Sequence, residues 1–272
     1  MSFSYNMADI DSISATLGIP WEVSKDQPFG PTTTYIRFIW NLRERTVKLS
    51  PKKVTKYLRS IEDWRSRPAH YLEDVQKLYG ELLHTASLVP AGRAYLTGLE
   101  CMLAVCAAKP FMPHKQDEAI HEELMWWHHT IENGVAIHNI FPPPSCVDHQ
   151  AFSDASSSIG IGIVIGKHWR AWRLFPGWQT LNGKRDIAWA EAVGFELLLR
   201  TLSSSINSSQ HITIYGNNTS IIESWKVGRH WNKLVNNVFK RIHSFLAECS
   251  SNLISAHTAF VPSEHNPADG PS

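Results

Sequence analysis

The spacing of hydrophobic residues changes near the middle of the chain. Between residues 51 and 133, apolar side chains recur every three to four residues, which predicts amphipathic helices. Beyond residue 147, apolar and polar residues alternate in short runs, which predicts strands. The change falls at 141–146, Phe-Pro-Pro-Pro-Ser-Cys, which we interpret as a linker because consecutive prolines continue neither a helix nor a central strand. The chain therefore divides into two parts of different architecture.

The first part is predicted to combine a hairpin with helices. We expect residues 1–34 to be irregular and residues 35–49 to form a short hairpin, because apolar positions alternate there and return after a charged turn. The pair Ser50-Pro51 is a typical helix start, with a capping residue and a proline at the first helical position. Prolines separate the helices that follow, and Asn133-Gly134 ends the last of them. Residues 35–140 are thus predicted to form an α+β unit.

The second part is predicted to be an α/β domain over 147–272. We expect three strands, a helix, a strand, two helices, a further strand and a final helix that begins at Asp269. The ranges before that last helix are 147–156, 159–166, 168–175, 186–202, 211–216, 218–226, 231–248 and 256–262. Antiparallel strands that lead into parallel strand–helix units favour a mixed five-stranded sheet with flanking helices.

Composition and local hydropathy restrict the class of protein. The longest run of only apolar residues and glycine, 159–166, is far shorter than the roughly 20 residues of a membrane span. The first 18 residues have no basic start and no apolar stretch, so we expect no secretory signal and a location in the cytoplasm or nucleus. The 4 cysteines form no Cys-x-x-Cys pair and are expected to be reduced thiols.

Positive charge is concentrated in one block although the net charge is only +1. Residues 37–67 hold ten Lys or Arg against three acidic residues. Such a block can bind nucleic-acid phosphates, and it can equally be an ordinary solvated helix face. The candidates for phosphate contacts share one predicted helix: Lys52, Lys53, Lys56 and Arg59. On the third strand of the second part, Trp169 and Trp172 are expected to point the same way, where they could stack on bases.

Three acidic residues stand where predicted strands end or helices begin. Asp154 ends the first strand of the second part, Glu191 lies on the helix that follows the three strands, and Asp269 follows the last strand. Carboxylates on separate elements that converge over a sheet edge are typical ligands of Mg²⁺, and two such cations can assist phosphodiester hydrolysis. Each acid could also be a solvated or helix-capping residue, so their placement rather than their number makes them candidates.

Four ordered motifs in the second part resemble a ribonuclease H domain of the retroelement type. They are Phe-Ser-Asp-Ala-Ser from 152, Trp-Ala-Glu-Ala from 189, Tyr-Gly-Asn-Asn from 215 and Asn-Pro-Ala-Asp from 266. The resemblance covers about 147–272 and implies a ribonuclease H-like fold. It also implies a catalytic site of Asp154, Glu191, Asn217 and Asp269, with the three acids as metal ligands for two Mg²⁺ ions, and an RNA–DNA hybrid as the substrate.

The first part resembles the segment that follows the palm of a reverse transcriptase. The stretches that carry this likeness are Leu-Gly-Ile-Pro-Trp-Glu from 17, Tyr-Ile-Arg-Phe-Ile-Trp from 35 and Lys-Leu-Ser-Pro-Lys-Lys from 48. They are similar to a primer-grip hairpin with thumb or connection helices, particularly in fungal DIRS-like retrotransposons of the tyrosine-recombinase class. The fingers and the palm with its paired aspartates are absent from this chain, so no polymerase site is expected.

Asn217 departs from the family pattern, which has an aspartate at this position. Losing one charge about 4 Å from a unit charge costs about 4 kcal/mol at an effective dielectric of about 20. We therefore expect hydrolysis to be lost or strongly weakened, with the second Mg²⁺ site the most affected. Three functions remain open at this point: a nucleic-acid-binding domain that no longer cuts, an active Mg²⁺-dependent ribonuclease H, and a domesticated protein-interaction module.

Overall fold

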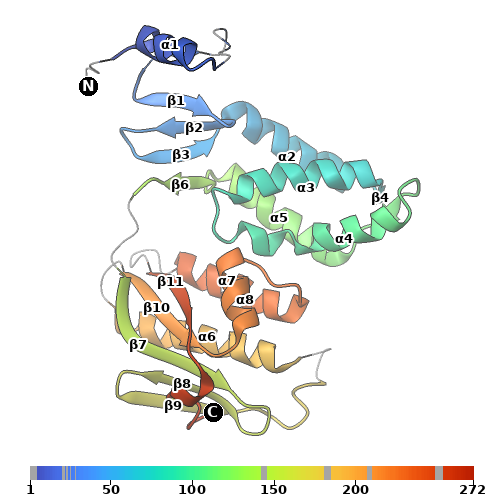
Figure 1. Cartoon of the computed structure of the whole chain (residues 1–272). Coiled ribbons are helices and arrows are strands. Elements are labelled where there is room, and N and C mark those ends of the chain that lie inside the picture. Colours follow the sequence, from blue (N-terminus) through green and yellow to red (C-terminus); the bar gives the residue numbers. More distant parts are fainter. Residues whose placement is uncertain are drawn as a thin grey trace.

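The computed structural model describes residues 5–19, 22, 24, 26–27, 29–141, 146–180, 185–206, 210–248 and 254–272. Figure 1 shows a helical unit with a small sheet, and beside it a second unit built on a larger sheet. No helix in these described ranges is both long and apolar enough to cross a membrane. Cys101, Cys106 and Cys146 are free thiols, whereas Cys249 lies outside the described residues.

The N-terminal segment is more regular than its sequence predicts. Helix α1 (Met7–Thr16) lies within 1–34, so the prediction of an irregular segment was wrong there. A capping box explains why this helix forms: the Asn6 side chain accepts from the backbone of the first turn, and the Asp9 carboxylate accepts from the Asn6 backbone N–H. The apolar pattern in this short stretch is too weak to indicate the helix by itself.

The predicted hairpin is part of a four-stranded antiparallel sheet. The strands are β1 (Thr32–Tyr35), β2 (Phe38–Asn41), β3 (Thr46–Leu49) and β6 (Ile137–Asn139), in the order β1-β2-β3-β6. The prediction of one strand beginning at Tyr35 was wrong, because Ile36 and Arg37 form a tight turn with φ angles of 49° and 69°. Such left-handed turns usually carry Asn or Gly, and neither residue is present here to indicate the turn.

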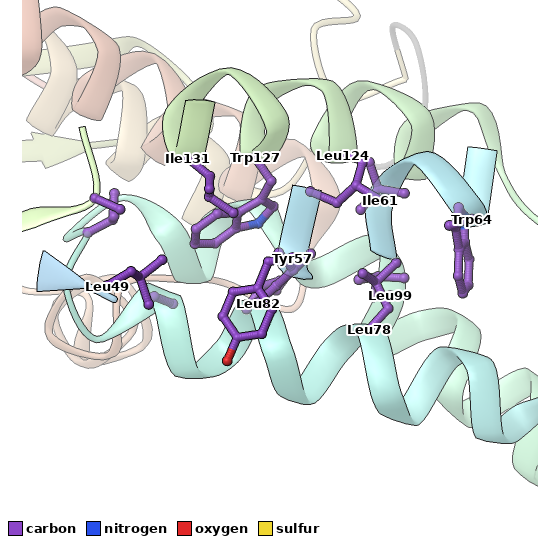
Figure 2. Packing of buried hydrophobic residues seen from close by; sticks show 14 of the residues in the cluster. Leu49, Tyr57, Ile61, Trp64, Leu78, Leu82, Leu99, Leu124, Trp127 and Ile131 are labelled. Carbon is purple, nitrogen blue, oxygen red and sulfur yellow. The ribbon is translucent and has the colours of Figure 1, made fainter. Parts of the chain in front are cut away.

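Four helices pack around a shared apolar core, as predicted. They are α2 (Pro51–Arg65), α3 (Leu72–Ala86), α4 (Thr97–Ala108) and α5 (Glu118–Glu132), with a 3₁₀ turn at Gly92–Tyr95 and a two-stranded ladder of β4 (Ala69–His70) and β5 (His114–Lys115). Figure 2 shows their buried side chains, among them Tyr57, Ile61, Leu82, Leu124 and Trp127. Burying these apolar faces is what holds the unit together.

The second unit contains the predicted mixed sheet. Its strands are β7 (Cys146–Ala155), β8 (Gly160–Ile165), β9 (His168–Arg173), β10 (Gln210–Gly216) and β11 (Ile254–Phe260), and the order across the sheet is β11-β10-β7-β8-β9. The first three strands pair antiparallel, and β10 pairs parallel to both β7 and β11. This confirms the predicted α/β class and is consistent with a ribonuclease H-like fold.

Three helices accompany this sheet: α6 (Ile187–Ser203), α7 (Thr219–Val227) and α8 (Lys233–Glu248). The final helix predicted from Asp269 is absent; a 3₁₀ turn at Ser263–His265 is followed only by turns. Asn266 holds this segment in turns, since its side-chain amide donates to the Ser153 carbonyl at 3.1 Å and its side-chain oxygen accepts from the Ala268 N–H at 3.1 Å. Of the predicted linker 141–146, residues 142–145 lie outside the described residues, and Cys146 already belongs to β7.

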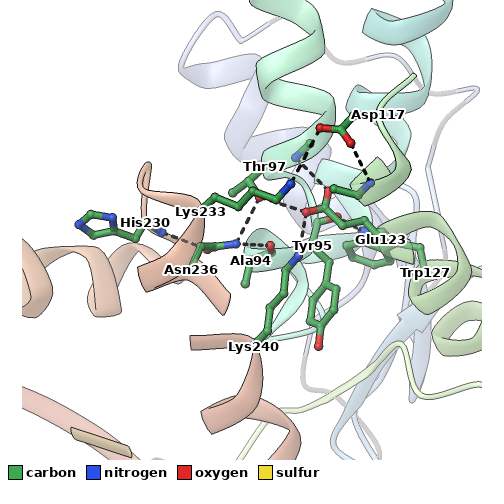
Figure 3. A network of polar contacts seen from close by, with 12 residues as sticks. Ala94, Tyr95, Thr97, Asp117, Glu123, Trp127, His230, Lys233, Asn236 and Lys240 are labelled. Carbon is green, nitrogen blue, oxygen red and sulfur yellow. Dashed lines mark hydrogen bonds and ion pairs between the residues drawn. The ribbon is translucent and has the colours of Figure 1, made fainter. Parts of the chain in front are cut away.

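A buried carboxylate joins the two units (Figure 3). Glu123 on α5 is 2% exposed and accepts hydrogen bonds from the Thr97 hydroxyl at 3.0 Å and the Gly98 backbone N–H at 2.9 Å. Lys240 on α8 of the other unit reaches the same carboxylate, with its Nζ 2.8 Å from Oε1. Because its partners come from both units, Glu123 fixes α8 against the start of α4.

Asn236 makes a second polar contact across this junction. Its buried side-chain amide donates to the carbonyl oxygen of Ala94 at 2.8 Å and accepts from the backbone N–H of His230 at 3.1 Å. A buried amide with both ends satisfied favours one relative position of the two units, because sliding would leave its polar groups unpaired.

Replacing Lys240 by Ala tests this junction. The substitution leaves the Glu123 carboxylate buried without its counter-charge, so we expect a loss of about 3 kcal/mol in the free energy of unfolding. The control is Lys233→Ala, because Lys233 lies 3.9 Å from Asp117 in a pair that is exposed on both sides. That control should cost less than about 1 kcal/mol. Urea unfolding of both variants measures the difference, and equal losses would contradict the role of Glu123.

Candidate functional site

Parallel pairing of β7 and β10 brings Asp154 and Asn217 together. Phe152 on β7 is in register with Tyr215 on β10, and Asp154 and Asn217 follow two residues later in the same direction. The Asn217 side-chain N–H donates to Asp154 Oδ1 over 2.7 Å, and its nitrogen is also 3.1 Å from the Ser263 hydroxyl. An ionised carboxylate can only accept, so the amide must turn its donor end toward Asp154.

The second oxygen of Asp154 is occupied by Ser272. The Ser272 hydroxyl donates to Asp154 Oδ2 over 2.7 Å, and the Ser156 hydroxyl donates to the backbone carbonyl of Ser272 over 3.0 Å. This contact needs Gly162 on β8, because a Cβ there would lie 2.7 Å from the Ala268 carbonyl oxygen and 2.8 Å from the Ser272 nitrogen. Ser272 belongs to the site, and the sequence contains no periodic or motif signal that singles it out.

Glu191 lies beside this pair on α6. Its side chain is buried, with the residue 4% exposed, and one carboxyl oxygen, Oε2, has no hydrogen-bond partner. Burial first, and the nearby charge of Asp154 second, raise the pKa of Glu191 to about 8, against the opposing effect of a hydrogen bond from the Ala155 backbone. Glu191 therefore carries a proton at neutral pH.

Asp269 is not part of this cluster of side chains. It is exposed, and its contact with the site is made by its backbone carbonyl, 3.0 Å from the Ser272 hydroxyl. Within the described part of the chain, no three His, Cys, Asp or Glu side chains form a group that could hold a metal ion. The structure thus brings together Asp154, Glu191 and Asn217 but leaves the Asp269 carboxylate outside, since the helix expected to carry it is absent.

The arrangement does not fit the two Mg²⁺ ions that the family resemblance implies. A divalent cation is held by lone pairs of several oxygens. Here both Asp154 oxygens already accept hydrogen bonds, from an amide N–H and a hydroxyl, and the nearest second carboxyl is protonated at neutral pH. A cation could bind only after Asn217 and Ser272 turn their donors away and Glu191 loses its proton.

The predicted phosphate-binding residues lie together on α2, in the other unit. Lys52, Lys56 and Arg59 are exposed, and Lys53 is half-buried. Burial, followed by the charges of Lys56 and Arg37, lowers the pKa of Lys53.

An acid beneath this surface balances part of its charge. Glu81 on α3 is buried, and Lys56 Nζ lies 2.7 Å from Glu81 Oε1. Sequence analysis missed this residue because it follows the helical stripe of α3, whose other buried members are mostly apolar. Lys52 and Arg59 have no acidic partner in the described part of the chain.

Comparisons with known proteins give a distant likeness. The chain matches no known protein-family model and no curated protein. Among solved structures it is similar to a foamy viral protease-reverse transcriptase in complex with double-stranded DNA, at 12% sequence identity and a TM-score of 0.40. The match covers 93% of this chain and 42% of the viral chain, so this chain spans less than half of that protein's length.

Replacing Glu191 by Gln tests the raised pKa. The native pKa of about 8 lies above the ordinary value of 4.5. The contribution of this difference to the free energy of unfolding is therefore fully present below about pH 4.5. It is lost as the pH rises through about 8. We expect Glu191→Gln to lose less thermal stability than the wild type between about pH 5 and pH 9, and to be the more stable protein at the upper end.

The control for this experiment is Glu223→Gln, which removes an exposed glutamate on α7. It should keep the pH profile of the wild type, because its carboxylate is screened by solvent. A wild-type profile for Glu191→Gln as well would show that Glu191 ionises normally in the folded protein.

Proposed function

We propose that this chain is a nucleic-acid-binding, ribonuclease H-like part of a retroelement reverse transcriptase in which hydrolysis is lost or strongly weakened. The observation that carries the proposal is the hydrogen bond from the Asn217 amide to Asp154. In the family pattern this position is an aspartate, which provides negative charge to a cation. Here the same position provides a hydrogen-bond donor instead.

The chemistry of the site supports weakened hydrolysis. With one amide at the fourth position, three carboxylates supply at most −3 where four would supply −4. One of the three, Asp269, is exposed outside the cluster, and another, Glu191, holds a proton at neutral pH. Both Asp154 oxygens accept hydrogen bonds, from the Asn217 amide and the Ser272 hydroxyl, which stabilises the site without a cation. We expect this molecule to act inside the cell.

Two specific observations bear on the alternative of an active Mg²⁺-dependent ribonuclease H. Asp154 and Glu191 do lie close enough for the charge of one to raise the pKa of the other, and Glu191 Oε2 lacks a partner. A weakly bound cation at these two residues, favoured above about pH 8, would allow residual cleavage. The third alternative, a domesticated interaction module, predicts neither cleavage nor salt-dependent binding of nucleic acid.

Duplex binding is assigned to the exposed face of α2. Among the described residues, Lys52 and Arg59 have no acidic partner, while Glu81 reduces the contribution of Lys56. Contacts of this kind recognise the phosphate backbone and carry no sequence preference. The choice of an RNA–DNA hybrid, the thumb or connection identity of the helical unit, and the relation to DIRS-like elements rest on the sequence motifs.

Substituting Asn217→Asp is expected to create a cation site. Without a divalent cation, two carboxylates replace an amide–carboxylate hydrogen bond, so the variant should melt below the wild type in a chelator. With Mn²⁺ or Mg²⁺ the order should reverse, and the cation should bind at least about tenfold more tightly than to the wild type. Thermal melts and cleavage of a labelled RNA–DNA hybrid measure both effects.

Asn218→Asp is the matched control, because it adds the same charge one residue away and still caps α7 through the oxygen that accepts from Ile221. It should give neither effect. Vigorous Mg²⁺-dependent cleavage by the unmodified chain, abolished by Asp154→Asn, would overturn the proposed loss of hydrolysis.

Replacing Lys52, Lys53, Lys56 and Arg59 together by Gln tests the binding surface. The logarithm of the binding constant falls linearly with the logarithm of the salt concentration. Each lost phosphate contact should make this slope shallower by about 0.9 on duplexes of the B form. We therefore expect weaker binding at low salt and a slope smaller by up to about 4. Fluorescence anisotropy with a hybrid and with a DNA duplex measures the slopes.

A second quadruple variant removes equal charge from outside the block, at the exposed residues Lys77, Lys109, Lys115 and Lys226. Its slope should be close to that of the wild type. If both quadruple variants reduce affinity and slope equally, the α2 face has no special role in binding.

A further inference from the structure

Strand β9 forms one edge of the five-stranded sheet. It pairs with β8 on one side, and no described strand pairs with its other side (Figure 1). In an edge strand, the N–H and C=O groups of every second residue point away from the sheet without a ladder partner. The outer side of β9 therefore offers backbone hydrogen-bonding groups to an additional strand.

The sheet is hollowed on both faces next to this edge. On the face that carries α6 there is a groove of about 580 Å³, and on the face that carries the C-terminal segment there is a hollow of about 380 Å³. Trp169 lines both, and it is 68% exposed although an exposed indole is costly. Successive side chains of an added strand point to opposite faces, so they would enter the two hollows in turn.

Both hollows combine apolar and cationic lining. On the α6 side, Ile165, Trp172 and Leu197 line the groove together with Arg170 and other polar side chains. On the other side the hollow is bounded by Lys167 and by the apolar residues Val164, Pro267 and Pro271. Neither Arg170 nor Lys167 has an acidic partner in the described part of the chain. This combination fits apolar anchors flanked by carboxylates.

The two tryptophans of β9 do not form the base-stacking pair expected from the sequence. Trp169 is in register with Val164, and Trp172 is in register with Ile161, so they lie three residues apart on opposite faces of the strand. The prediction that they point the same way was wrong, because side chains alternate with a period of two in a strand. Trp172 instead lines the groove on the α6 face, and Trp169 lines both hollows.

We propose that the β9 edge binds an extended acidic peptide segment of a partner protein by adding it as a sixth strand. The main-chain groups of β9 supply affinity, the two hollows take apolar side chains on alternate faces, and Arg170 and Lys167 select carboxylates. Charged side chains on an edge strand would protect it against aggregation. The exposed Trp169 and the two hollows give no such protection, because they favour contact with another molecule, and so they indicate a partner.

Charge and shape argue against two other molecules that could bind at the β9 edge, a second copy of this chain and single-stranded nucleic acid. A second copy that paired through its own β9 would bring His168, Arg170 and Arg173 of both strands to one seam with no acidic residue of β9 between them, and such like-charge contacts are unfavourable. Single-stranded nucleic acid would be attracted by the cations, but it has no main-chain amides that could extend the ladder of β9, and the single exposed indole of Trp169 offers successive bases no continuous stacking platform. The proposal does not depend on hydrolysis at Asp154.

The test uses the full chain and a fluorescein-labelled peptide of about eight residues that alternates Val or Ile with Glu. The matched control peptide has the same sequence with N-methyl groups on every second residue, in either register, which removes its strand-pairing donors. We expect the first peptide to bind at least about tenfold more tightly by fluorescence anisotropy, and to slow amide hydrogen exchange in β9.

A charge exchange completes the test. The variant Lys167→Glu/Arg170→Glu should lose at least about tenfold in affinity for the Glu peptide and gain affinity for the same peptide with Lys in place of Glu. Equal binding of the N-methylated peptide, or no binding of the Glu peptide, would overturn the proposal. Sedimentation that shows a dimer lost in this variant, or an oligonucleotide that binds with the same dependence on Arg170, would also overturn it.

Discussion

The parallel pairing of β7 with β10 is the constraint on which the candidate site depends. It places Asp154 and Asn217 at neighbouring strand ends, so that a carboxylate and an amide meet where a pair of carboxylates would hold a cation. Glu191 approaches the same point from α6, and its proton follows from burial beside Asp154. Because both Asp154 oxygens accept hydrogen bonds, from Asn217 and Ser272, the site is a hydrogen-bond network and not an open set of cation ligands.

The C-terminal segment takes part in this change. Ser272 satisfies the second Asp154 oxygen, and only the absence of a side chain at Gly162 lets the segment lie close enough. Because the segment turns instead of forming a helix, the Asp269 carboxylate faces solvent. Packing thus decides which groups touch Asp154.

The two units are held in a fixed relation by buried polar groups. Glu123 accepts from its own unit and from Lys240 of the other, and the Asn236 amide donates across the same junction to Ala94 while it accepts from His230 of its own unit. Unlike apolar contacts, such groups lose favourable interactions with any sliding. The basic face of α2 and the edge of β9 are therefore presented on one body.

The sequence by itself determined most elements of both units and the positions of Asp154, Glu191 and Asn217 on or next to them. Helix and strand patterns depend on residues a few positions apart, so the start of α2 and the five strands of the mixed sheet could be predicted. The turn at Ile36 could not, because it carries no typical turn residue. Only the tertiary structure decided that Ser272 caps Asp154, that Glu191 keeps a proton, and that Glu81 balances Lys56. These facts depend on distances between residues far apart in the chain, 118 positions for Ser272 and Asp154, and on the low dielectric that burial creates around them.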